Sequence, residues 1–587
     1  MTGLKRTNYC GDFTIDNVGQ EVVVAGWVQR QRDLGALIFI DLRDRSGIVQ
    51  LSFGESTDKE VFEKAFGARS EYVLMAKGVV KERSSKNKDI PTGEIEIDVT
   101  DLRVLGKSET PPFEIVADCH TSELTRLKYR YLDLRRPDLQ ANILMRHKIT
   151  KIIRDYFDEN GFIEIETPML IKSTPEGARD FLVPSRIHKG SFYALPQSPQ
   201  LYKQLSMVAG FDRYMQIARC FRDEDLRADR QPEFTQIDVE MSFVDMEDIL
   251  DMIEKFIIRL FKEALGVDVN APFVRMTYAD AMNKYGSDKP DTRYDMEICD
   301  ISEEVKSCGF GVFTGAIENG GKVCAINAKN GYSKLTRKEI DKLVEYVRGI
   351  GAKGLAFMRI AQDGTVASSF AKFMSEDEMA AIMAKTDAKP GDVILIVADK
   401  AATTLSVLGS LRQTVAAKLD IIPQDKYNLL WIVEFPFFDW DEDEGQFVAM
   451  HHPFTSPMDD CDLEGDKANV RAKAYDLVLN GVELASGSIR ITNPDLQKRM
   501  FTMLGFSDEE AQEKFGFLTD AFKYGAPPHG GIGLGLDRLI MQMLRLETLR
   551  DVVAYPKVQN ASEPMTQCPA LVDEIQLGDL GIACIKE

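Results

Sequence analysis

The sequence has little that would build a membrane or secreted protein. It contains no apolar run near the roughly 20 residues that a membrane-spanning helix needs, since its apolar runs are short stretches such as Val393 to Ala398. The first residues, MTGLKRTNYCGDF, have no apolar core of the kind that a signal peptide carries. We therefore expect a cytoplasmic protein without a membrane partner.

Cysteine and histidine are sparse and poorly spaced for metal binding. The nine cysteines include no C-x-x-C pair, and none stands at metal-ligand spacing from the six histidines. His451 and His452 are adjacent, but no third ligand follows at the usual spacing. We expect neither structural zinc nor disulfides.

Positive charge is also in deficit, with 72 Lys and Arg against 93 Asp and Glu and a net charge of −21. A nucleic-acid partner usually requires a basic surface. One local cluster, RLKYRYLDLRR at Arg126 to Arg136, has the charge to contact a phosphate backbone. Overall charge therefore does not decide whether the partner is a nucleic acid.

The length of 587 residues predicts several domains, because one domain typically takes ~100 to 200 residues. From Glu21 to about Leu105, about five short alternating runs are separated by turns, which indicates a small β-barrel. Met145, Ile149 and Tyr156 then recur at helical spacing, Gly161 ends the helix, and FIEIETPMLI predicts a strand.

A change of composition indicates an inserted domain. Residues 296–423 are rich in Gly and Ala, and they hold a charged helix near Thr336 to Gly349 and strands such as GLAFMRI and DVILIVA, but no catalytic constellation. We predict a barrel at 1–106, a hinge at 107–139, a first core segment at 140–295, an insertion at 296–423 and a second core segment at 424–587.

Residues Arg219 to Phe243 alternate apolar and polar side chains on both sides of a charged loop, which predicts a strand, a loop and a strand. Phe234, Gln236, Asp238 and Glu240 then share one face, and Ile237, Val239, Met241 and Phe243 share the other. The loop carries Arg222, Glu224, Arg227, Arg230 and Gln231, a set that suits a nucleoside triphosphate. A solvated hairpin tip is the alternative.

Two further windows add chemistry. Gly530 to Arg538, GGIGLGLDR, predicts a glycine-rich strand that enters a helix with Arg538 in its first turn. Asp476 and Glu483 flank a Gly turn between two strands, and paired carboxylates suit Mg²⁺, which prefers oxygen ligands.

The windows at Arg219 to Phe243 and Gly530 to Arg538 resemble motifs 2 and 3 of class II aminoacyl-tRNA synthetases. The string FRDEDLRADRQPEFTQ and nearly the whole chain resemble the bacterial aspartyl-tRNA synthetases. This resemblance implies an α+β multidomain fold with an N-terminal OB-fold barrel, an antiparallel-sheet catalytic core with flanking helices, and an α+β insertion domain. It also implies a homodimer, formed through the helix and strand before Pro168, that attaches L-aspartate to tRNA(Asp) with ATP and Mg²⁺.

The resemblance also implies roles for individual residues. The catalytic cations would be Arg222 and Arg538. The aspartate ligands would be Glu176, Gln200, Lys203, Arg222, Asp238, His451 and Arg490. The ATP ligands would be Arg222, Asp223, Glu224, Gln231, Phe234, Glu483, Gly535, Leu536, Asp537 and Arg538, with Phe234 stacked on adenine and Mg²⁺ on Asp476 and Glu483.

The barrel would read the anticodon with Arg30, Phe39 and Gln50, because OB barrels stack aromatic side chains on single-stranded bases. From composition alone, a buried Phe39 is the alternative. Members of the family that also charge the asparagine tRNA often carry D-H-G-G where this chain has Asp33-Leu34-Gly35-Ala36. Leu34 resembles the form that discriminates against tRNA(Asn), although it could merely shape the loop.

Three alternatives remain. A synthetase for asparagine or lysine shares the barrel and motifs but would not offer two cations, here Lys203 and Arg490, to a substrate side chain. A non-catalytic OB-fold RNA-binding protein typically loses the motif 2 or motif 3 arginine, and this chain retains both. A form that charges both the aspartate and the asparagine tRNA is the third. Neither HIGH nor KMSKS occurs, which excludes class I synthetases as far as motifs can.

Overall fold

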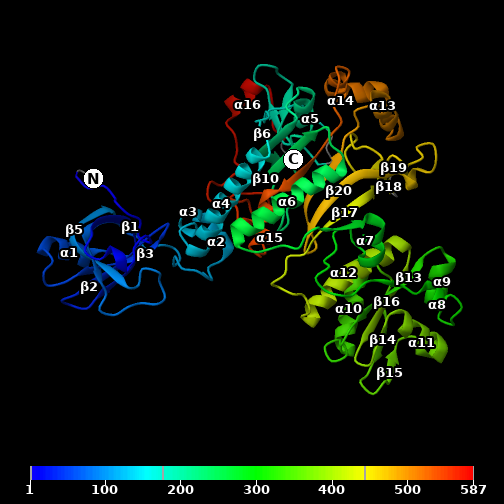
Figure 1. Cartoon of the computed structure of the whole chain (residues 1–587), viewed down its shortest axis with the longest axis horizontal. Helices are drawn as coiled ribbons and strands as arrows, with labels where there is room; N and C mark the ends of the chain where they lie inside the picture. Colours follow the sequence, from blue (N-terminus) through cyan, green and yellow to red (C-terminus); the bar gives the residue numbers. More distant parts are fainter. Residues whose placement is uncertain (1–2, 175–177, 442–444, 586–587) are drawn as a thin grey trace. The chain divides into compact units, whose positions relative to one another are not determined.

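The computed structural model describes residues 3–174, 178–441 and 445–585 (Figure 1). The chain divides into two compact units. One comprises Met1–His147, Leu226–Gln231 and Leu546–Val572, and the other comprises Lys148–Asp225, Pro232–Arg545 and Asp573–Glu587. Within the described ranges, no helix is long and apolar enough to cross a membrane.

The first unit contains a closed five-stranded barrel with the order β1-β2-β3-β5-β4. Alternate residues such as Ile38, Ile40 and Leu42 are fully buried inside it, which confirms the barrel predicted from alternation. The strands are β1 (Glu21–Asp33), β2 (Ile38–Asp44), β3 (Gly47–Phe53), β4 (Val73–Glu82) and β5 (Ile95–Gly106). The helical turns of the unit are η1 (Ile15–Asn17), α1 (Lys59–Gly67), α2 (Glu123–Lys128), α3 (Arg130–Asp133) and η4 (Leu549–Asp551).

Two arginines of the basic segment after the barrel, Arg130 and Arg136, are buried and bind other parts of the same unit. Arg130 is buried and donates to the carbonyl oxygens of Ala554, Arg550 and Val553. Arg130 and Arg136 also bind the fully buried Asp133 at 2.7 and 3.0 Å. These arginines hold the segment against the rest of the unit.

The second unit is built on an eight-stranded sheet with the order β11-β17-β20-β21-β22-β10-β9-β6. Neighbouring strands are antiparallel except for the outermost pairs, β11 with β17 and β6 with β9. The strands are β6 (Ile163–Glu164), β9 (Arg213–Phe221), β10 (Glu233–Ser242), β11 (Val274–Thr277), β17 (Leu429–Pro436), β20 (Arg471–Leu479), β21 (Val482–Ile489) and β22 (His529–Gly535). The predicted strand-loop-strand, the Asp476–Glu483 hairpin and the glycine-rich strand are confirmed, whereas FIEIETPMLI forms only the short β6.

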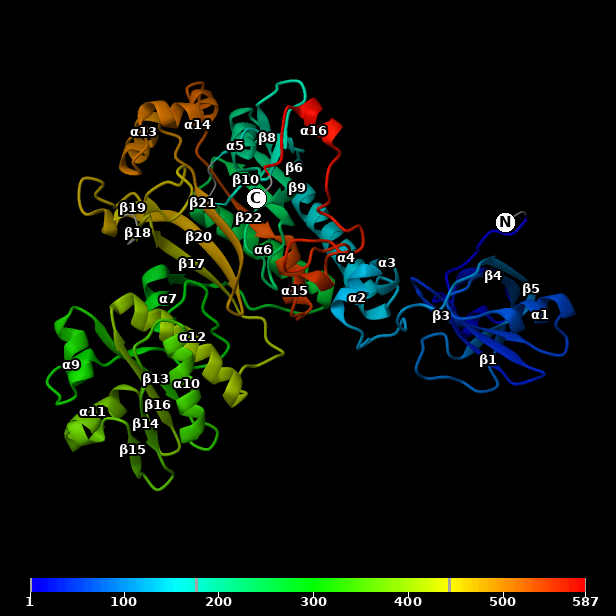
Figure 2. The same ribbon diagram turned by 180° about the vertical axis from the view of Figure 1, so that it is seen from behind.

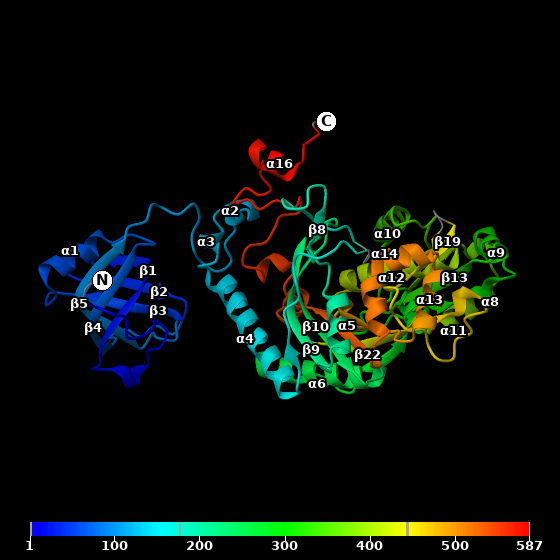
Figure 3. The ribbon, with the colours of Figure 1, turned by 90° about the horizontal axis from the view of Figure 1, so that it is seen from above.

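Helices α5 (Gln200–Val208) and α6 (Met246–Leu265) lie on opposite faces of this sheet. A Cβ built on Gly530 would meet Ile249 of α6, whereas one built on the next residue, Gly531, would meet Glu240 on the face that α5 covers. Helix α4 (Pro137–Glu159) lies beside α6, where the Tyr156 hydroxyl donates to the Met252 carbonyl (Figure 3). Phe243 was predicted to lie on the apolar face of this strand, but β10 ends at Ser242. Phe243 therefore lies outside the strand and is 72% exposed.

Shorter elements complete the sheet's surroundings. They are β7 (Leu182–Pro184), β8 (Phe192–Ala194), β18 (Phe438–Asp441), β19 (Gln446–Ala449), α7 (Tyr278–Tyr285), η3 (Lys467–Asn469), α13 (Pro494–Met503), α14 (Asp508–Phe522), α15 (Leu536–Met543) and α16 (Glu574–Leu580). Helix α15 follows β22 directly, and Arg538 is in its first turn as predicted.

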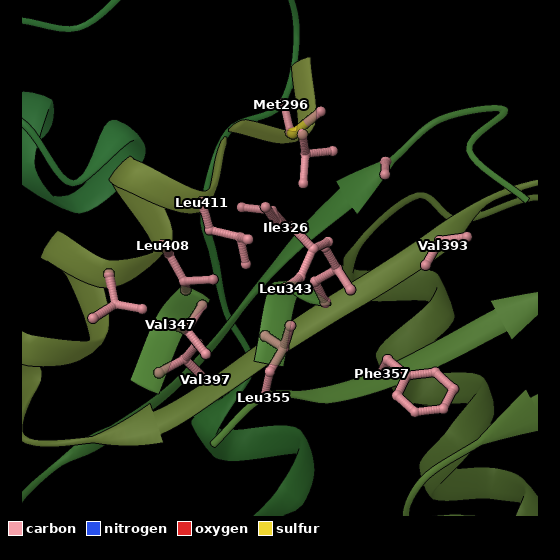
Figure 4. Close-up of a cluster of buried hydrophobic side chains, with 14 of the residues drawn as sticks. Met296, Ile326, Leu343, Val347, Leu355, Phe357, Val393, Val397, Leu408 and Leu411 are labelled. Carbon is pink, nitrogen blue, oxygen red and sulfur yellow. The ribbon is translucent and has the colours of Figure 1, made fainter. Parts of the chain in front are cut away.

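The inserted segment forms its own antiparallel sheet with the order β12-β13-β16-β14-β15. Alternate residues of β16 face two separate cores. Leu395 and Val397 join Leu343, Val347 and Leu411 of α10 and α12 (Figure 4), while Ile394 and Ile396 pack on the opposite face. The elements are β12 (Cys299–Asp300), α8 (Ser302–Val305), α9 (Gly311–Glu318), β13 (Lys322–Ala328), α10 (Arg337–Gly349), β14 (Ala356–Ile360), β15 (Val366–Ser368), η2 (Ala371–Phe373), α11 (Glu376–Lys385), β16 (Val393–Asp399) and α12 (Ala401–Leu419). Helix α10 matches the charged helix predicted there.

Candidate active site

The glycines of β22 make room for a row of polar side chains on β10. In the register of the two strands, Gly531 is opposite Glu240 and Gly533 is opposite Asp238. A Cβ on Gly531 would lie 1.9 Å from Glu240 Oε2, and one on Gly533 would lie 1.9 Å from Gln236 Nε2. Larger residues would therefore displace the polar row, which gives the glycine-rich motif a steric reason.

Four charged side chains form a buried cluster above these glycines. Lys203 Nζ of α5 lies 2.7 Å from Asp238 Oδ1 and 3.3 Å from Glu240 Oε2. Arg490 binds both oxygens of Glu240, with Nε at 2.9 Å and Nη2 at 3.0 Å. All four residues are at most 4% exposed. Two cations thus face two carboxylates in a site shielded from water.

Burial and the neighbouring charges set the ionisation of the cluster. Burial raises the pKa of Asp238 above its usual value despite Lys203. Burial has the same tendency at Glu240, but Arg490 and Lys203 outweigh it and lower the pKa of that carboxyl. Glu240 is therefore the firmly ionised partner, and Asp238 is the carboxyl whose charge depends most on its surroundings.

A second layer fixes Arg490. Its Nη1 contacts His452 Nε2 at 2.7 Å and donates to the Ser488 hydroxyl, and Thr455 Oγ1 bonds Ser488 Oγ at 3.2 Å. Burial, followed by the charge of Arg490, holds the pKa of His452 well below its ordinary value. A neutral imidazole suits this contact, because its Nε2 can accept from the guanidinium.

Of the two adjacent histidines, His452 contacts Arg490, and the predicted aspartate ligand His451 has other surroundings. Its ring meets Phe435 edge-on at 5.1 Å, and burial lowers its pKa to about 4. The sequence prediction missed His452, because adjacent histidines give no signal of which side chain points to a distant arginine.

The cluster corrects one argument about specificity. The offer of two cations to the substrate side chain was expected to favour aspartate over asparagine or lysine, but Asp238 and Glu240 already neutralise Lys203 and Arg490. Asparagine is disfavoured instead by the direction of its hydrogen bonds. A carboxylate accepts hydrogen bonds from both cations, whereas the amide nitrogen of asparagine presents N–H donors to Lys203 and Arg490, which have no acceptor.

Several buried polar atoms of the predicted ligand residues have no hydrogen-bond partner among the described residues. They are Gln200 Nε2, Asp238 Oδ2, His451 Nε2 and Arg222 Nε. Unsatisfied buried groups are rare in native proteins and call for a ligand or another explanation. Both Gln200 and Lys203 lie on the buried side of α5. Glu176, predicted to bind the substrate ammonium, lies outside the described residues.

The predicted ATP ligands Arg222 and Phe234 lie just after the end of β9 and near the start of β10, and Arg538 lies in the first turn of α15. The Arg222 guanidinium lies over the Phe234 ring at 5.1 Å, and Arg538 donates to the Glu483 carbonyl at 2.9 Å. Asp537 is buried and accepts from the Thr235 backbone N–H at 2.8 Å, so it ties α15 to β10. Gly535 precedes the helix as its N-cap, and the buried Leu536 begins it.

The predicted magnesium ligands, Asp476 and Glu483, lie on the paired strands β20 and β21. Burial and the like charge of Glu483 raise the pKa of Asp476 well above its usual value, and its buried Oδ1 has no hydrogen-bond partner among the described residues. Lys289 lies 3.8 Å from Glu483. A divalent cation fits this pair of oxygen donors, although no group of three ligands occurs in the described part of the chain.

The remaining loop residues have other surroundings. In the first unit, the Gln231 amide donates to the Lys557 carbonyl and accepts from the Lys557 N–H, at 3.1 and 2.8 Å. Asp223 is exposed and bridges to Arg179, while Glu224 is half-buried. Backbone-bound Gln231 has the contacts of a structural residue, and the ATP role predicted for it remains a prediction.

On the barrel, a small polar and aromatic group surrounds Phe39. Phe39 is half-exposed between the buried Ile38 and Ile40, so it lies outside the barrel core. Arg32 lies over its ring at 5.6 Å and donates to Gln50 Oε1 at 2.7 Å.

The residues predicted to read the anticodon differ in their contacts and exposure. Gln50 is buried and also binds Glu96 and Arg83. Arg30 is exposed, and Leu34 is 68% exposed in the loop between β1 and β2. The structure thus adds Arg32, which the sequence prediction missed in favour of Arg30. Both arginines face the same side of β1, so the sequence pattern does not show which of them contacts Phe39. The contacts in the structure assign Arg32 to this position.

The model of class II tRNA synthetases (D, K and N) matches residues 122–559, and the model of the OB-fold nucleic acid binding domain matches residues 22–105. An aspartate–tRNA ligase of Ruminiclostridium cellulolyticum is 58% identical over 100% of this chain and 99% of its own length. The chain belongs to the bacterial aspartate–tRNA ligase family of class II synthetases. Within that family, an aspartate–tRNA(Asp/Asn) ligase of Lachnoclostridium phytofermentans is 55% identical over 100% of this chain and 99% of its own length.

Solved structures support the fold of the family. The asparaginyl-tRNA synthetase of Pyrococcus horikoshii covers 94% of this chain, and 98% of its own chain is matched, with a TM-score of 0.59 at 18% identity. A putative aspartyl-tRNA synthetase of Leishmania major has the same TM-score and identity over 92% of this chain and 90% of its own. At this identity the likeness concerns the fold alone. The predicted α+β fold with an OB barrel is therefore confirmed.

Proposed function

We propose that this chain activates L-aspartate with ATP to an aspartyl-adenylate and then transfers the aspartyl group to the terminal ribose of tRNA(Asp). In the first step the α-carboxylate of aspartate attacks the α-phosphorus and pyrophosphate leaves. In the second, a ribose hydroxyl attacks the adenylate carbonyl and AMP leaves. No protein nucleophile is needed, so the protein contributes position and charge.

The observation that carries this proposal is the buried cluster of Lys203 and Arg490 with its unsatisfied neighbours. The side-chain carboxylate of aspartate would accept from Lys203 and Arg490, which are preorganised by Asp238, Glu240 and His452. The ammonium group would donate to Asp238 Oδ2, the buried oxygen without a partner among the described residues. Ligand and site would then satisfy each other.

Two further arginines, Arg222 and Arg538, would bind the phosphates of ATP. Arg222, with an unsatisfied Nε, would hold the α-phosphate and the attacking carboxylate. Adenine would stack on the face of Phe234 opposite Arg222, and Arg538 would contact the terminal phosphates. When bound by Asp476 and Glu483, Mg²⁺ would supply positive charge for the phosphate oxygens. The buried Asp476 carboxyl lies beside the half-exposed, like-charged Glu483, and a cation between them would offset this repulsion.

Aminoacylation of a tRNA(Asp) transcript with labelled aspartate tests the proposal. The wild-type chain should form aspartyl-tRNA in an ATP-dependent reaction, and it should form no asparaginyl- or lysyl-tRNA on the cognate transcripts of those amino acids. A protein that binds the transcript but forms no ester under any condition would be an RNA-binding module, and the proposal would be wrong.

Two finer points extend the proposal. We infer that tRNA(Asn) is rejected through the loop that carries the exposed Leu34; relatives named for one tRNA and for both have similar identity to this chain, 58% and 55%, so overall similarity does not settle it. We also infer a homodimer through α4 and β6. β6 is a sheet edge with Ile163 47% exposed, and an open edge readily pairs with another copy. Sedimentation equilibrium tests the dimer.

A further inference from the structure

A buried glutamate of the barrel, Glu71, binds two arginines from different parts of the first unit. It lies just before β4 and is 4% exposed. Arg43 of β2 donates from Nη2 to both of its carboxylate oxygens, at 2.9 and 2.8 Å. Arg135, which follows α3 in the segment after the barrel, donates from Nη1 to Glu71 Oε2 at 2.8 Å. One carboxylate is therefore shared between the barrel and the hinge segment, residues 107–139.

The backbone at Glu71 indicates that its side chain is needed there. Glu71 has a φ of 63°, in the left-handed region that favours glycine. A glycine would adopt this conformation without strain, so the backbone does not account for a glutamate. The carboxylate does, because Arg43 is 6% exposed and would otherwise be a buried cation without its anion.

Arg135 makes a second contact with the barrel. Its guanidinium lies over the ring of Trp27 in β1, 4.9 Å from the ring centroid, and the face of an aromatic ring attracts a cation. A further contact comes from Gln29 of the same strand, whose amide donates to the Ile115 carbonyl of the hinge segment at 3.0 Å. Arg43 also bonds Gln29. These contacts form one connected network between the barrel and the hinge segment.

The hinge segment is also bound to the remainder of the first unit. Arg130 donates to the carbonyl oxygens of Arg550, Val553 and Ala554. Residues 107–122, which connect β5 to α2, contain no helix or strand (Figure 2). Irregular segments are more mobile than the elements they connect. The contacts of Arg135 therefore restrict the barrel more than its chain connection does.

We propose that Arg135 and Glu71 are positioning residues for tRNA charging, because their ion pair fixes the barrel on the hinge segment. This inference rests on the proposed function. A barrel released from Arg135 still binds the anticodon, but it samples several orientations. Only some of them let the anticodon and the terminal ribose of one tRNA bind together, so the apparent affinity for tRNA falls with the competent fraction. Adenylate formation, which needs no tRNA, is not affected.

Charging of a tRNA(Asp) transcript and tRNA-independent pyrophosphate exchange, measured on the same full-length variants, test the proposal. Arg135→Met leaves the buried pair of Arg43 and Glu71 intact. It should raise the KM for tRNA about tenfold, the scale of one hydrogen bond between charged groups, with kcat and exchange near the wild-type values. Arg135→Lys retains the charge without the planar stack on Trp27 and should have an intermediate effect.

Arg45→Met is the matched control. Arg45 is exposed, and its guanidinium lies over the Tyr9 ring at 4.7 Å. The variant removes the same charge as Arg135→Met from a surface position, and it should change the KM for tRNA by no more than about twofold.

Glu71→Gln tests the sign of the effect. Removing a negative charge should by itself strengthen the binding of RNA, whereas weakening the pair with Arg135 should raise the KM for tRNA, and we expect the rise. Salt dependence separates positioning from a direct phosphate contact. The affinity of Arg135→Met for tRNA should keep the wild-type slope against salt concentration, whereas loss of a phosphate contact would reduce that slope by about 1.

Small-angle X-ray scattering without tRNA tests the position of the barrel directly. Arg135→Met and Glu71→Gln should each have a larger maximum dimension than the wild type and Arg45→Met. If Glu71→Gln lowers the melting temperature, Arg135→Met decides. Unchanged scattering of Arg135→Met would overturn the proposal, as would a lower KM for tRNA in Glu71→Gln, a reduced salt slope in Arg135→Met, or a parallel fall in exchange. Absence of charging by the wild type would contradict the proposed function instead, and scattering would still decide the role of the pair.

Discussion

Replacing Lys203 by methionine removes a cation from the buried cluster while keeping a side chain of similar length. In the wild-type site, Lys203 Nζ is 2.7 Å from Asp238 and 3.3 Å from Glu240, and its own exposure is 2%. Breaking a buried ion pair costs about 3 to 5 kcal/mol, since it leaves an uncompensated charge. The substrate carboxylate also loses a preorganised charged donor, so we expect kcat/KM for aspartate in pyrophosphate exchange to fall by a factor of roughly 10² to 10³.

The discrimination between aspartate and asparagine should fall in the same variant, because the substrate carboxylate loses one of its two donors while the amide loses one unfavourable contact. The KM for ATP should change little. Lys255→Met is the matched control: its side chain is 65% exposed and pairs with Asp251 on the surface of α6, so its effect should stay within about 0.5 kcal/mol.

The pH dependence of the melting temperature gives an independent check on Lys203, through its partner Asp238. Burial already raises the pKa of this carboxyl, and removal of Lys203 raises it further. A raised carboxyl pKa favours the protonated, folded state at low pH, and that contribution is lost as pH rises through the folded-state pKa. The melting temperature of Lys203→Met should therefore fall further below that of the wild type as the pH rises. Near-normal exchange with an unchanged aspartate preference would refute the assigned role of Lys203.

Four other outcomes are expected. Arg222→Ala should lose about 3 kcal/mol or more of transition-state stabilisation in adenylate formation, measured by pyrophosphate exchange, and a normal rate would remove it from the mechanism. Phe39→Ala should weaken tRNA charging by ~1 to 3 kcal/mol and leave exchange intact, whereas a loss of both activities would make Phe39 structural. Leu34→His should relax the preference for tRNA(Asp) by up to ~1 to 3 kcal/mol in charging of purified transcripts, and comparable wild-type charging of tRNA(Asn) would contradict this. Gly531→Ala should lower the free energy of unfolding by about 1 to 3 kcal/mol, because its Cβ would clash with Glu240 and the Val239 carbonyl oxygen, while Gly535→Ala, with no atom nearer than 3.7 Å, should not.

Local patterns in the sequence predicted much of the fold. Alternation located β9 and β10 and assigned Asp238 and Glu240 to one face, because side chains on a strand alternate with period two. Glycine runs located the turn between β20 and β21 and the strand β22. These features depend on neighbours in the chain, so a single sequence contains them.

Contacts between distant segments were not predictable in the same way. The pairing of Lys203 with Asp238 spans 35 residues, and that of Arg490 with Glu240 spans 250. Arg130 and Arg136 are positively charged, as residues that bind phosphates are. In the structure they are buried and bind Asp133, which the sequence pattern did not show. The choice of Arg32 over Arg30 beside Phe39 depends on side-chain conformation, which residue spacing does not specify.

Pyrophosphate exchange into ATP, run with each amino acid in turn and without tRNA, tests the central claim most directly. The account predicts rapid exchange with L-aspartate and exchange with L-asparagine lower by a factor of ~10⁴ or more, because Lys203 and Arg490 donate to both oxygens of a carboxylate, whereas the amide nitrogen of asparagine presents further N–H donors to them. Exchange driven equally well by asparagine or lysine would contradict it, as would the absence of exchange with any amino acid.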